Sequence, residues 1–271
     1  NLSMKKIIYD FGSARGENIP YYLLKSDLVV AVEANPDNCI YIKNKFKKEI
    51  ENSQLCLINC ILTEKSDVTK KFYIHKNNYL LGQFPKPDNL LENNFYSINL
   101  LCKDVLEIIK TYGEPHYIKI DLEQYDKAIL KRILLNGIKP PYISVEGTSE
   151  NILEILFSKN GYSAFKLIEG SNVGYLYRNQ KINLVSDIIK YSFPKNSAGP
   201  FGNDIYGHWI DKEKFLQLMR FKNFGWRDIH CSLEDHADTN ISFEKLMKIE
   251  IKREKKAKII KRFLRIISKF F

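Results

Sequence analysis

A glycine-bearing loop near the amino terminus is the first candidate for a chemical role. Residues 10–16 read Asp-Phe-Gly-Ser-Ala-Arg-Gly and end a short apolar stretch that begins at residue 5. Where a strand turns into a helix, Gly12 and Gly16 would let the backbone approach a ligand at the carboxyl edge of a sheet. A dinucleotide fingerprint would need glycine at positions 14 and 17, where the chain has Ala14 and Glu17. The loop therefore predicts a nucleotide-type site without that fingerprint.

An acid at the end of the next apolar stretch, residues 28–33, fits the same site. Glu33 lies where a carboxylate can accept both hydroxyls of a ribose. Together with this acid, the D-x-G-x-x-x-G loop resembles motif I of S-adenosylmethionine-dependent methyltransferases, whose donor carries an ammonium and a sulfonium. The acids could instead only cap a turn and a helix. The predicted contacts to S-adenosylmethionine are Asp10, Gly12, Ser13, Gly16, Asn18, Glu33, Asn35, Asn59 and Asp121.

The elements that must position these residues alternate between strand and helix patterns. Strands are expected at residues 5–11, 28–33, 55–62, 72–75, 117–123 and 142–146. Helices are expected at residues 19–24, after Asn35, and at residues 103–112, 126–135 and 149–159. This alternation predicts an α/β fold with a doubly wound, mostly parallel sheet, and a pairing of residues 162–168 with 174–178 as its antiparallel edge.

Three regions follow from this pattern. Residues 4–180 are predicted to form the S-adenosylmethionine-binding domain with a Rossmann-like methyltransferase fold. Residues 181–240 have little periodicity and are predicted to pack over the sheet as an acceptor-site appendage. A helical pattern that begins after Ser242 makes residues 241–271 a C-terminal helical appendage.

Later segments resemble the FkbM-type methyltransferases. The run Lys119-Ile120-Asp121-Leu122-Glu123 is similar to their K-I-D-x-E-G segment, with Gln124 in place of the glycine. Four further segments that resemble the family in the same order are residues 143–146, 161–166, 197–204 and 225–230. Family members typically methylate hydroxyls, many of them on sugars of surface glycans or glycolipids. The resemblance, over about residues 5–236, implies O-methyl transfer to such an acceptor.

Transfer of a methyl group to a hydroxyl needs an aligned acceptor and a base that removes its proton. The predicted catalytic residues are Asp121, Glu146, Asp228 and His230. Asp121 could instead only form an ion pair with Lys119, and a lone histidine is more often structural than catalytic. Asp228 and His230 are two residues apart and would share one face of an extended segment. That arrangement suits a base and the carboxylate that orients it.

Aromatic and polar residues of the appendage could hold a sugar ring. The predicted acceptor contacts are Glu123, Ser197, Phe201, Asp204, Trp209 and Trp226. The same residues could equally fill the edge of the core, and Glu123 could be a solvated loop acid. No metal ligands are predicted, because His208, His236, Asp235 and Asp238 meet no spacing rule for a metal site. The five cysteines contain no C-x-x-C pair and are expected to be free thiols.

Charge is distributed unevenly along the chain. Residues 250–271 carry +7 of the net charge of +10 and leave +3 for the rest, which makes nucleic acid an unlikely partner of the body. Basic and apolar residues alternate at helical spacing in this tail. Such a helix lies in an anionic membrane interface, but it also suits oligomerisation or packing on the domain. The basic residues are Lys258, Lys261, Arg262, Arg265 and Lys269, and the apolar ones are Ile259, Ile260, Phe263, Leu264, Ile266, Ile267, Phe270 and Phe271.

Three functions follow as alternatives. The first is an O-methyltransferase acting on a glycan or glycolipid. The second is an RNA methyltransferase whose basic tail holds phosphates. The third is a non-catalytic glycan-binding module on the same fold. The absence of a long apolar run and of a signal peptide predicts a cytoplasmic protein, with the tail as a peripheral contact to the inner membrane face.

Overall fold

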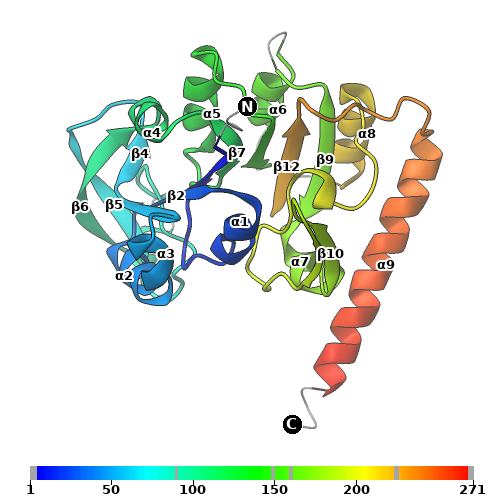
Figure 1. The fold of residues 1–271 in the computed structure, drawn as a ribbon, viewed down its shortest axis with the longest axis horizontal. Helices are drawn as coiled ribbons and strands as arrows, with labels where there is room; N and C mark the ends of the chain where they lie inside the picture. The colour runs from blue at the N-terminus through cyan, green and yellow to red at the C-terminus, as the bar shows by residue number, and fades with distance from the viewer. Residues whose placement is uncertain (1–4, 89–90, 148–149, 159–160, 223–225, 268–271) are drawn as a thin grey trace.

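The computed structural model describes residues 5–88, 91–147, 150–158, 161–222 and 226–267. Within them, a seven-stranded sheet forms the middle layer of the molecule, in the order β3-β2-β1-β7-β8-β12-β9 (Figure 1). The strands, in that order, are β3 (Leu55–Asn59), β2 (Leu28–Glu33), β1 (Ile7–Phe11), β7 (Pro115–Ile120), β8 (Tyr142–Glu146), β12 (Arg227–Ser232) and β9 (Ala164–Glu169). All of them run parallel except β12, which is antiparallel to both of its neighbours. The predicted α/β fold with a doubly wound, mostly parallel sheet is confirmed.

The antiparallel part of the sheet differs from the prediction. Residues 162–168 do not pair with 174–178. Instead β9 pairs with β12, and residues 173–176 form the short helix α7 (Val173–Leu176). The sheet is therefore not complete by residue 180, because β12 comes from the region predicted as an appendage and lies between β8 and β9.

Helices cover both faces of the sheet (Figure 1). They are α1 (Ile19–Lys25), α2 (Pro36–Lys45), α3 (Lys47–Glu51), α4 (Val105–Tyr112), α5 (Asp126–Leu135), α6 (Glu150–Leu156), α7, α8 (Lys212–Lys222) and α9 (Phe243–Ile267). Short 3-10 turns occur at Glu92–Asn94, Gly170–Asn172 and Gly202–Asp204. Asp104 caps α4 by accepting from the N–H of Leu106, and Asn35 caps α2 by accepting from that of Asp37.

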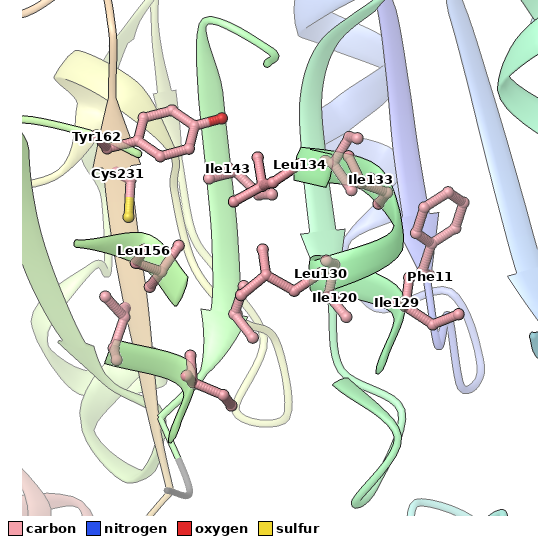
Figure 2. Packing of buried hydrophobic residues seen from close by; sticks show 14 of the residues in the cluster. Phe11, Ile120, Ile129, Leu130, Ile133, Leu134, Ile143, Leu156, Tyr162 and Cys231 are labelled. Atoms are coloured by element: carbon pink, nitrogen blue, oxygen red, sulfur yellow. The ribbon is translucent and has the colours of Figure 1, made fainter. Parts of the chain in front are cut away.

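The two faces of the sheet differ in character because side chains alternate along a strand. One face is wholly apolar and packs against α4, α5, α6 and α8. Figure 2 shows part of it, where Ile129, Leu130 and Ile133 of α5 lie near Ile120 and Ile143 of the strands. The other face packs its apolar residues against α1, α2 and α7. Its carboxyl edge carries the polar residues, which the next section describes.

A small three-stranded sheet stands beside the carboxyl edge of the main one. Its order is β4-β6-β5, from β4 (Ile61–Thr63), β6 (Phe95–Asp104) and β5 (Thr69–His75). The predicted strand at 55–62 is thus divided at residue 60 into β3 and β4, which belong to different sheets. A two-stranded ribbon of β10 (Gln180–Asn183) and β11 (Ile188–Tyr191) lies near α7 (Figure 1).

The C-terminal helix α9 begins after Ser242, whose hydroxyl accepts from the N–H of Lys245, as predicted. Its residues 246–257 attach it to the body through buried Leu246 and Ala257 and through ion pairs from Lys222 to Glu250 and Glu254. Beyond Ala257 the helix leaves apolar side chains exposed, with 69% of Ile259 and 61% of Phe263 accessible. Lys269, Phe270 and Phe271 lie outside the described residues, as do the side chains of Ile266 and Ile267. In the part of the chain that is described, no helix is long and apolar enough to cross a bilayer.

Candidate active site

A cavity of about 430 Å³ opens at the carboxyl edge of the sheet, where β1, β2, β7 and β8 end. Doubly wound sheets bind their ligands at this edge. Its floor comes from the loop after β1 and from Glu33 at the end of β2. A second group of residues, Asp121, Glu123, Glu146 and Asp228, lines the cavity from β7, β8 and β12. We call these two parts the loop end and the acid end.

Glu33 organises the loop end. One carboxylate oxygen accepts from the N–H of Ala14 at 2.7 Å and the other accepts from the N–H of Asn35, also at 2.7 Å. Burial raises the pKa of Glu33 to about 7, although these two bonds oppose the shift. A carboxylate has about four lone-pair sites, so both oxygens can still accept from a ligand. Glu33 is therefore held in a fixed position at the cavity floor.

Gly12 lets the loop cross the end of β7. It adopts φ +83°, and a Cβ built on it would lie 1.8 Å from the carbonyl oxygen of Asp121. Gly16 also has a positive φ, and a Cβ there would lie 2.8 Å from the ring of Phe46. The glycines thus permit close packing of the loop against the sheet and α2. They do not both expose their backbone to the cavity. Gly12 lines the cavity, whereas Gly16 does not.

The remaining predicted donor contacts divide into two groups. Ser13 and Asn18 line the cavity with Glu33 and Gly12. Asp10, Asn35 and Asn59 are not among the lining residues and instead support the site from behind. Asn59, for example, donates from its side-chain amide to the carbonyl oxygens of Glu33 and Ala34, each at 2.9 Å.

Lys119 connects the two ends of the cavity. Its buried Nζ donates to the carbonyl oxygen of Gly12 at 2.8 Å and lies 3.2 Å from Asp121 and 3.6 Å from Asp10. Burial opposes its charge, but Asp121 and Asp10 outweigh burial and raise the pKa of Lys119. The alternative considered for Asp121, an ion pair with Lys119, is thus present, yet Asp121 also lines the cavity. The contact between Lys119 and the glycine loop was not predicted from the sequence.

The acid end gathers carboxylates from three strands. Carboxylate oxygens of Asp121, Glu123 and Glu146 lie within 4.8 Å of one another. Burial and the neighbouring acids raise the pKa of Glu123 to about 7 and that of Glu146 to about 9. Asp228 faces Glu146 across the β8–β12 ladder and is only 2% exposed, and burial followed by Asp121 raises its pKa to about 7. One region of the cavity therefore concentrates carboxyl groups that oppose one another's ionisation.

His230 does not reach the cavity, contrary to its predicted catalytic role. It lies one strand period deeper than Asp228, is 2% exposed, and is not among the lining residues. Burial and the nearby charge of Lys166 lower its pKa to about 3, so the imidazole stays neutral. Asp228 and His230 do share a face of β12, but only Asp228 lies at the edge of the sheet where the cavity opens.

Most of the predicted acceptor-binding residues lie in the core. Phe201 stacks on Tyr117 with ring centroids 4.2 Å apart, and Trp209 is 6% exposed beneath the amino group of Lys166. Asp204 is buried between Tyr21 and Lys25. These three residues fill the edge of the core, the alternative that their composition allowed. In these positions, Phe201, Asp204 and Trp209 cannot contact a sugar in the cavity.

Two predicted acceptor contacts, by contrast, lie at the cavity. Glu123 and Trp226 both line it, and Trp226 is 43% exposed. Ser197 is buried and acts indirectly, because its hydroxyl and the N–H of Ala198 both donate to the side-chain oxygen of Asn18. The appendage therefore supplies one aromatic side chain to the site and fixes the Asn18 side chain.

The outer wall of the cavity was not anticipated from the sequence. It consists of Phe72 from β5, residues 78–82 and 84 from the following loop, and Tyr125. Tyr79 donates from its hydroxyl to Glu17, and the guanidinium of Arg15 lies 4.0 Å from its ring centroid. The only sequence signal was a polar stretch rich in Asn and Pro. Such stretches do not reveal which side chains will face a ligand.

The strand order, with its antiparallel strand between β8 and β9, defines a doubly wound, mostly parallel α/β sheet. Among solved structures, the chain is similar to an FkbM methyltransferase from Methylobacillus flagellatus, at 16% identity and a TM-score of 0.36, over 53% of this chain and 32% of that one. A precorrin-6y C5,15-methyltransferase from Geobacter metallireducens matches at 12% identity and 0.33, over 69% and 74% of the two chains. An rRNA methylase from Streptococcus thermophilus matches at 10% identity and 0.35, over 69% and 87%.

All three likenesses have identities of 16% or lower and TM-scores of 0.36 or lower, so no role of this chain is argued from them. This chain spans about a third of the length of the FkbM methyltransferase that it resembles. No protein-family model matches the chain, and no curated protein does. The acceptor must therefore be argued from the site.

Proposed function

We propose that this chain is an S-adenosylmethionine-dependent O-methyltransferase that methylates a hydroxyl of a sugar in a glycan or glycolipid. The observation that carries the proposal is the loop end, where Glu33 and the Gly12–Asn18 loop form the floor of a cavity at the carboxyl edge of the sheet. A carboxylate in this position accepts the two hydroxyls of a ribose. The acids of the cavity suit the positive charge of the donor and would repel a pyrophosphate.

When bound, S-adenosylmethionine supplies an electrophilic methyl group on a sulfonium. The residues of the chain then have to hold the acceptor oxygen in line with that carbon and remove its proton. Asp228 is suited to accept the proton, because its Oδ2 has no hydrogen-bond partner within the described structure and the residue lines the cavity. In such a transfer the Asp228 carboxylate would take the proton of the acceptor hydroxyl, while the loop end would hold the donor in place.

The acceptor class rests on two features of the cavity. Glu123 and Glu146 offer acceptors for sugar hydroxyls, and the exposed indole of Trp226 offers a surface for a sugar ring. The same acids disfavour RNA, because each phosphate would bring another negative charge to the acid end. A glycan acceptor is therefore the better fit to this cavity.

The first test is calorimetric titration with S-adenosylhomocysteine. We expect binding by the wild type and a loss of about 100-fold in affinity for Glu33→Ala, since the ribose hydroxyls lose their shared acceptor. Glu51→Ala is the matched control, because that side chain is exposed on α3. Equal affinity in the wild type and Glu33→Ala would remove the basis of the donor assignment.

The second test separates an enzyme from a binding module. Labelled methyl transfer to a panel of glycans and glycolipids should occur with the wild type and fall about 100-fold in Asp228→Asn, the usual scale for acid–base assistance. We expect His230→Gln to lose much less, because that side chain lies outside the cavity. Donor and glycan binding without any transfer would favour the non-catalytic module.

A peripheral membrane contact through α9 is a further part of the proposal. Ile259 and Phe263 are exposed, and residues 256–265 of the helix include five basic residues and no acid. A deletion that starts at residue 251 would also remove buried Ala257, so point substitutions are the cleaner test. We expect Ile259→Ser with Phe263→Ser to reduce binding to anionic vesicles by about tenfold or more at low salt, with donor affinity unchanged. Vesicle binding that does not depend on these side chains would leave α9 as a packing element.

A further inference from the structure

The acid end contains more carboxylates than the bound donor or a general base requires. Asp121 follows β7, Glu123 lies in the turn after it, and Glu146 ends β8, so the ends of two neighbouring strands bring the three together. Within the described residues, neither Glu123 nor Glu146 makes a hydrogen bond or an ion pair. Lys119 contacts only Asp121 among the three. This grouping is electrostatically unfavourable unless something positive joins it.

A second observation points to the same place from another strand. Asp228 of β12 is 98% buried, lines the cavity beside Glu146, and has no hydrogen-bond partner for its Oδ2 within the described structure. A buried carboxylate oxygen without a donor is costly unless a ligand or an ion completes it. Asp228 lies across the ladder from Glu146, so its unpartnered oxygen belongs to the acid end.

We propose that Asp121, Glu123 and Glu146 bind a hard divalent cation, with Asp228 beside it. The site offers only carboxylate oxygens, which suit Mg²⁺, Mn²⁺ or Ca²⁺ and not the softer metals that prefer nitrogen or sulfur. Opposite ligands of Mg²⁺ lie about 4.2 Å apart and those of Ca²⁺ about 5 Å, because the bond lengths are about 2.1 and 2.5 Å. Oxygens within 4.8 Å of one another can therefore converge on one such cation after a small side-chain movement.

The position of the site gives the cation a role. The three carboxylates are half-buried and line the cavity, so some coordination positions remain open to water or to a ligand oxygen. A hydroxyl bound there would lose its proton more readily, because the cation stabilises the alkoxide. This role rests on the proposed methyltransferase function, whereas cation binding itself does not.

The test is titration of the full-length, chelator-treated chain with MnCl₂, followed by calorimetry and by the Mn²⁺ electron paramagnetic resonance signal. We expect a single Mn²⁺ site that Mg²⁺ and Ca²⁺ displace. Glu123→Gln and Glu146→Gln, which keep the shape of the side chain, should each weaken Mn²⁺ binding by at least about tenfold. Glu244→Gln is the matched control, because it makes the same chemical change on the exposed first turn of α9. Circular dichroism confirms that each variant is folded.

Two results would overturn the site. One is no Mn²⁺ binding by the wild type at millimolar concentration, and the other is Mn²⁺ binding that both glutamine variants retain in full. A parallel titration with S-adenosylhomocysteine separates this inference from the proposed function. If Mn²⁺ binds and the donor analogue does not, the methyltransferase proposal fails while the cation site stands.

Discussion

The two ends of the cavity both present carboxylates, but they satisfy them differently. At the loop end, each oxygen of Glu33 already accepts from a backbone N–H at 2.7 Å. At the acid end, Glu123 and Glu146 have no such donors within the described residues, and one oxygen of Asp228 is unpartnered. The comparison teaches that equal charge does not imply equal function. The loop end is fixed before a ligand arrives, whereas the acid end is completed by what binds there.

The largest expected effect concerns the geometry of the loop end. Gly12→Ala should destabilise the fold by about 3 kcal/mol or more and abolish donor binding, because the new methyl group meets the carbonyl oxygen of Asp121 at 1.8 Å. Gly137→Ala is the matched control. That glycine also has a positive φ, of +77°, but a Cβ there meets nothing within 4 Å, so only about 1 kcal/mol of backbone strain is expected. Chemical denaturation of the two variants measures the difference, and similar losses would show that the contact with β7 is not decisive.

Only part of the fold and of the site was predictable from the sequence. The loop, Glu33 and the strands at residues 28–33 and 142–146 were predictable, because each is a local pattern of apolar residues, glycines and terminal acids. The pairing of β9 with β12 was not, because more than 50 residues separate the two strands and a nearby segment offered a plausible local partner. For the same reason Asp228 and His230 could not be told apart. Only the register of β12 decides which of them reaches the cavity.

The same substitution should have opposite effects at the two ends. Glu33→Gln should destabilise the ligand-free, chelator-treated chain by about 1–2 kcal/mol at pH 8, because the new amide nitrogen would face the N–H of Ala14 or Asn35. Glu123→Gln should stabilise it by about 1 kcal/mol, because one of the mutually repelling charges is removed. Urea denaturation measures both. Changes of the same sign would mean that the two ends do not differ as described.

A smaller effect should appear in the pH dependence of donor binding. Glu33 has a pKa raised to about 7, so it loses its proton as pH rises through that value. The carboxylate accepts ribose hydroxyls better than the neutral acid does, so affinity for S-adenosylhomocysteine should rise by about tenfold between pH 5.5 and 8.5. Stability should move in the opposite direction. The raised pKa contributes stability that is fully present below about pH 4.5 and is lost as pH rises through about 7.

Calorimetry of the wild type and Glu33→Gln over this pH range is the check. The variant has no group that titrates at this position, so its affinity should be lower and nearly constant. An equal rise in the variant's affinity for S-adenosylhomocysteine would assign the pH dependence to another group. Donor binding at the loop end would then depend little on the charge of Glu33.

The smallest expected effect lies in the turn that carries Glu123 to the acid end. Glu123 and Gln124 adopt φ +48° and +79°, the left-handed region that costs an ordinary residue about 1–2 kcal/mol. Gln124 stands where the resembled family usually has glycine, and its dihedral is one that glycine adopts without strain. The side chain of Gln124 is exposed, so Gln124→Gly removes strain without removing a buried contact. After the entropy cost of a new glycine, a gain of about 0.5 kcal/mol in the free energy of unfolding is expected, while Gln124→Ala, which keeps the strain, should change it little.

If the strained turn also restricts Glu123 to its place beside Asp121 and Glu146, the glycine variant should bind Mn²⁺ more weakly although it is more stable. A glycine variant that is more stable and binds Mn²⁺ unchanged would show that the acid end does not depend on the stiffness of this turn.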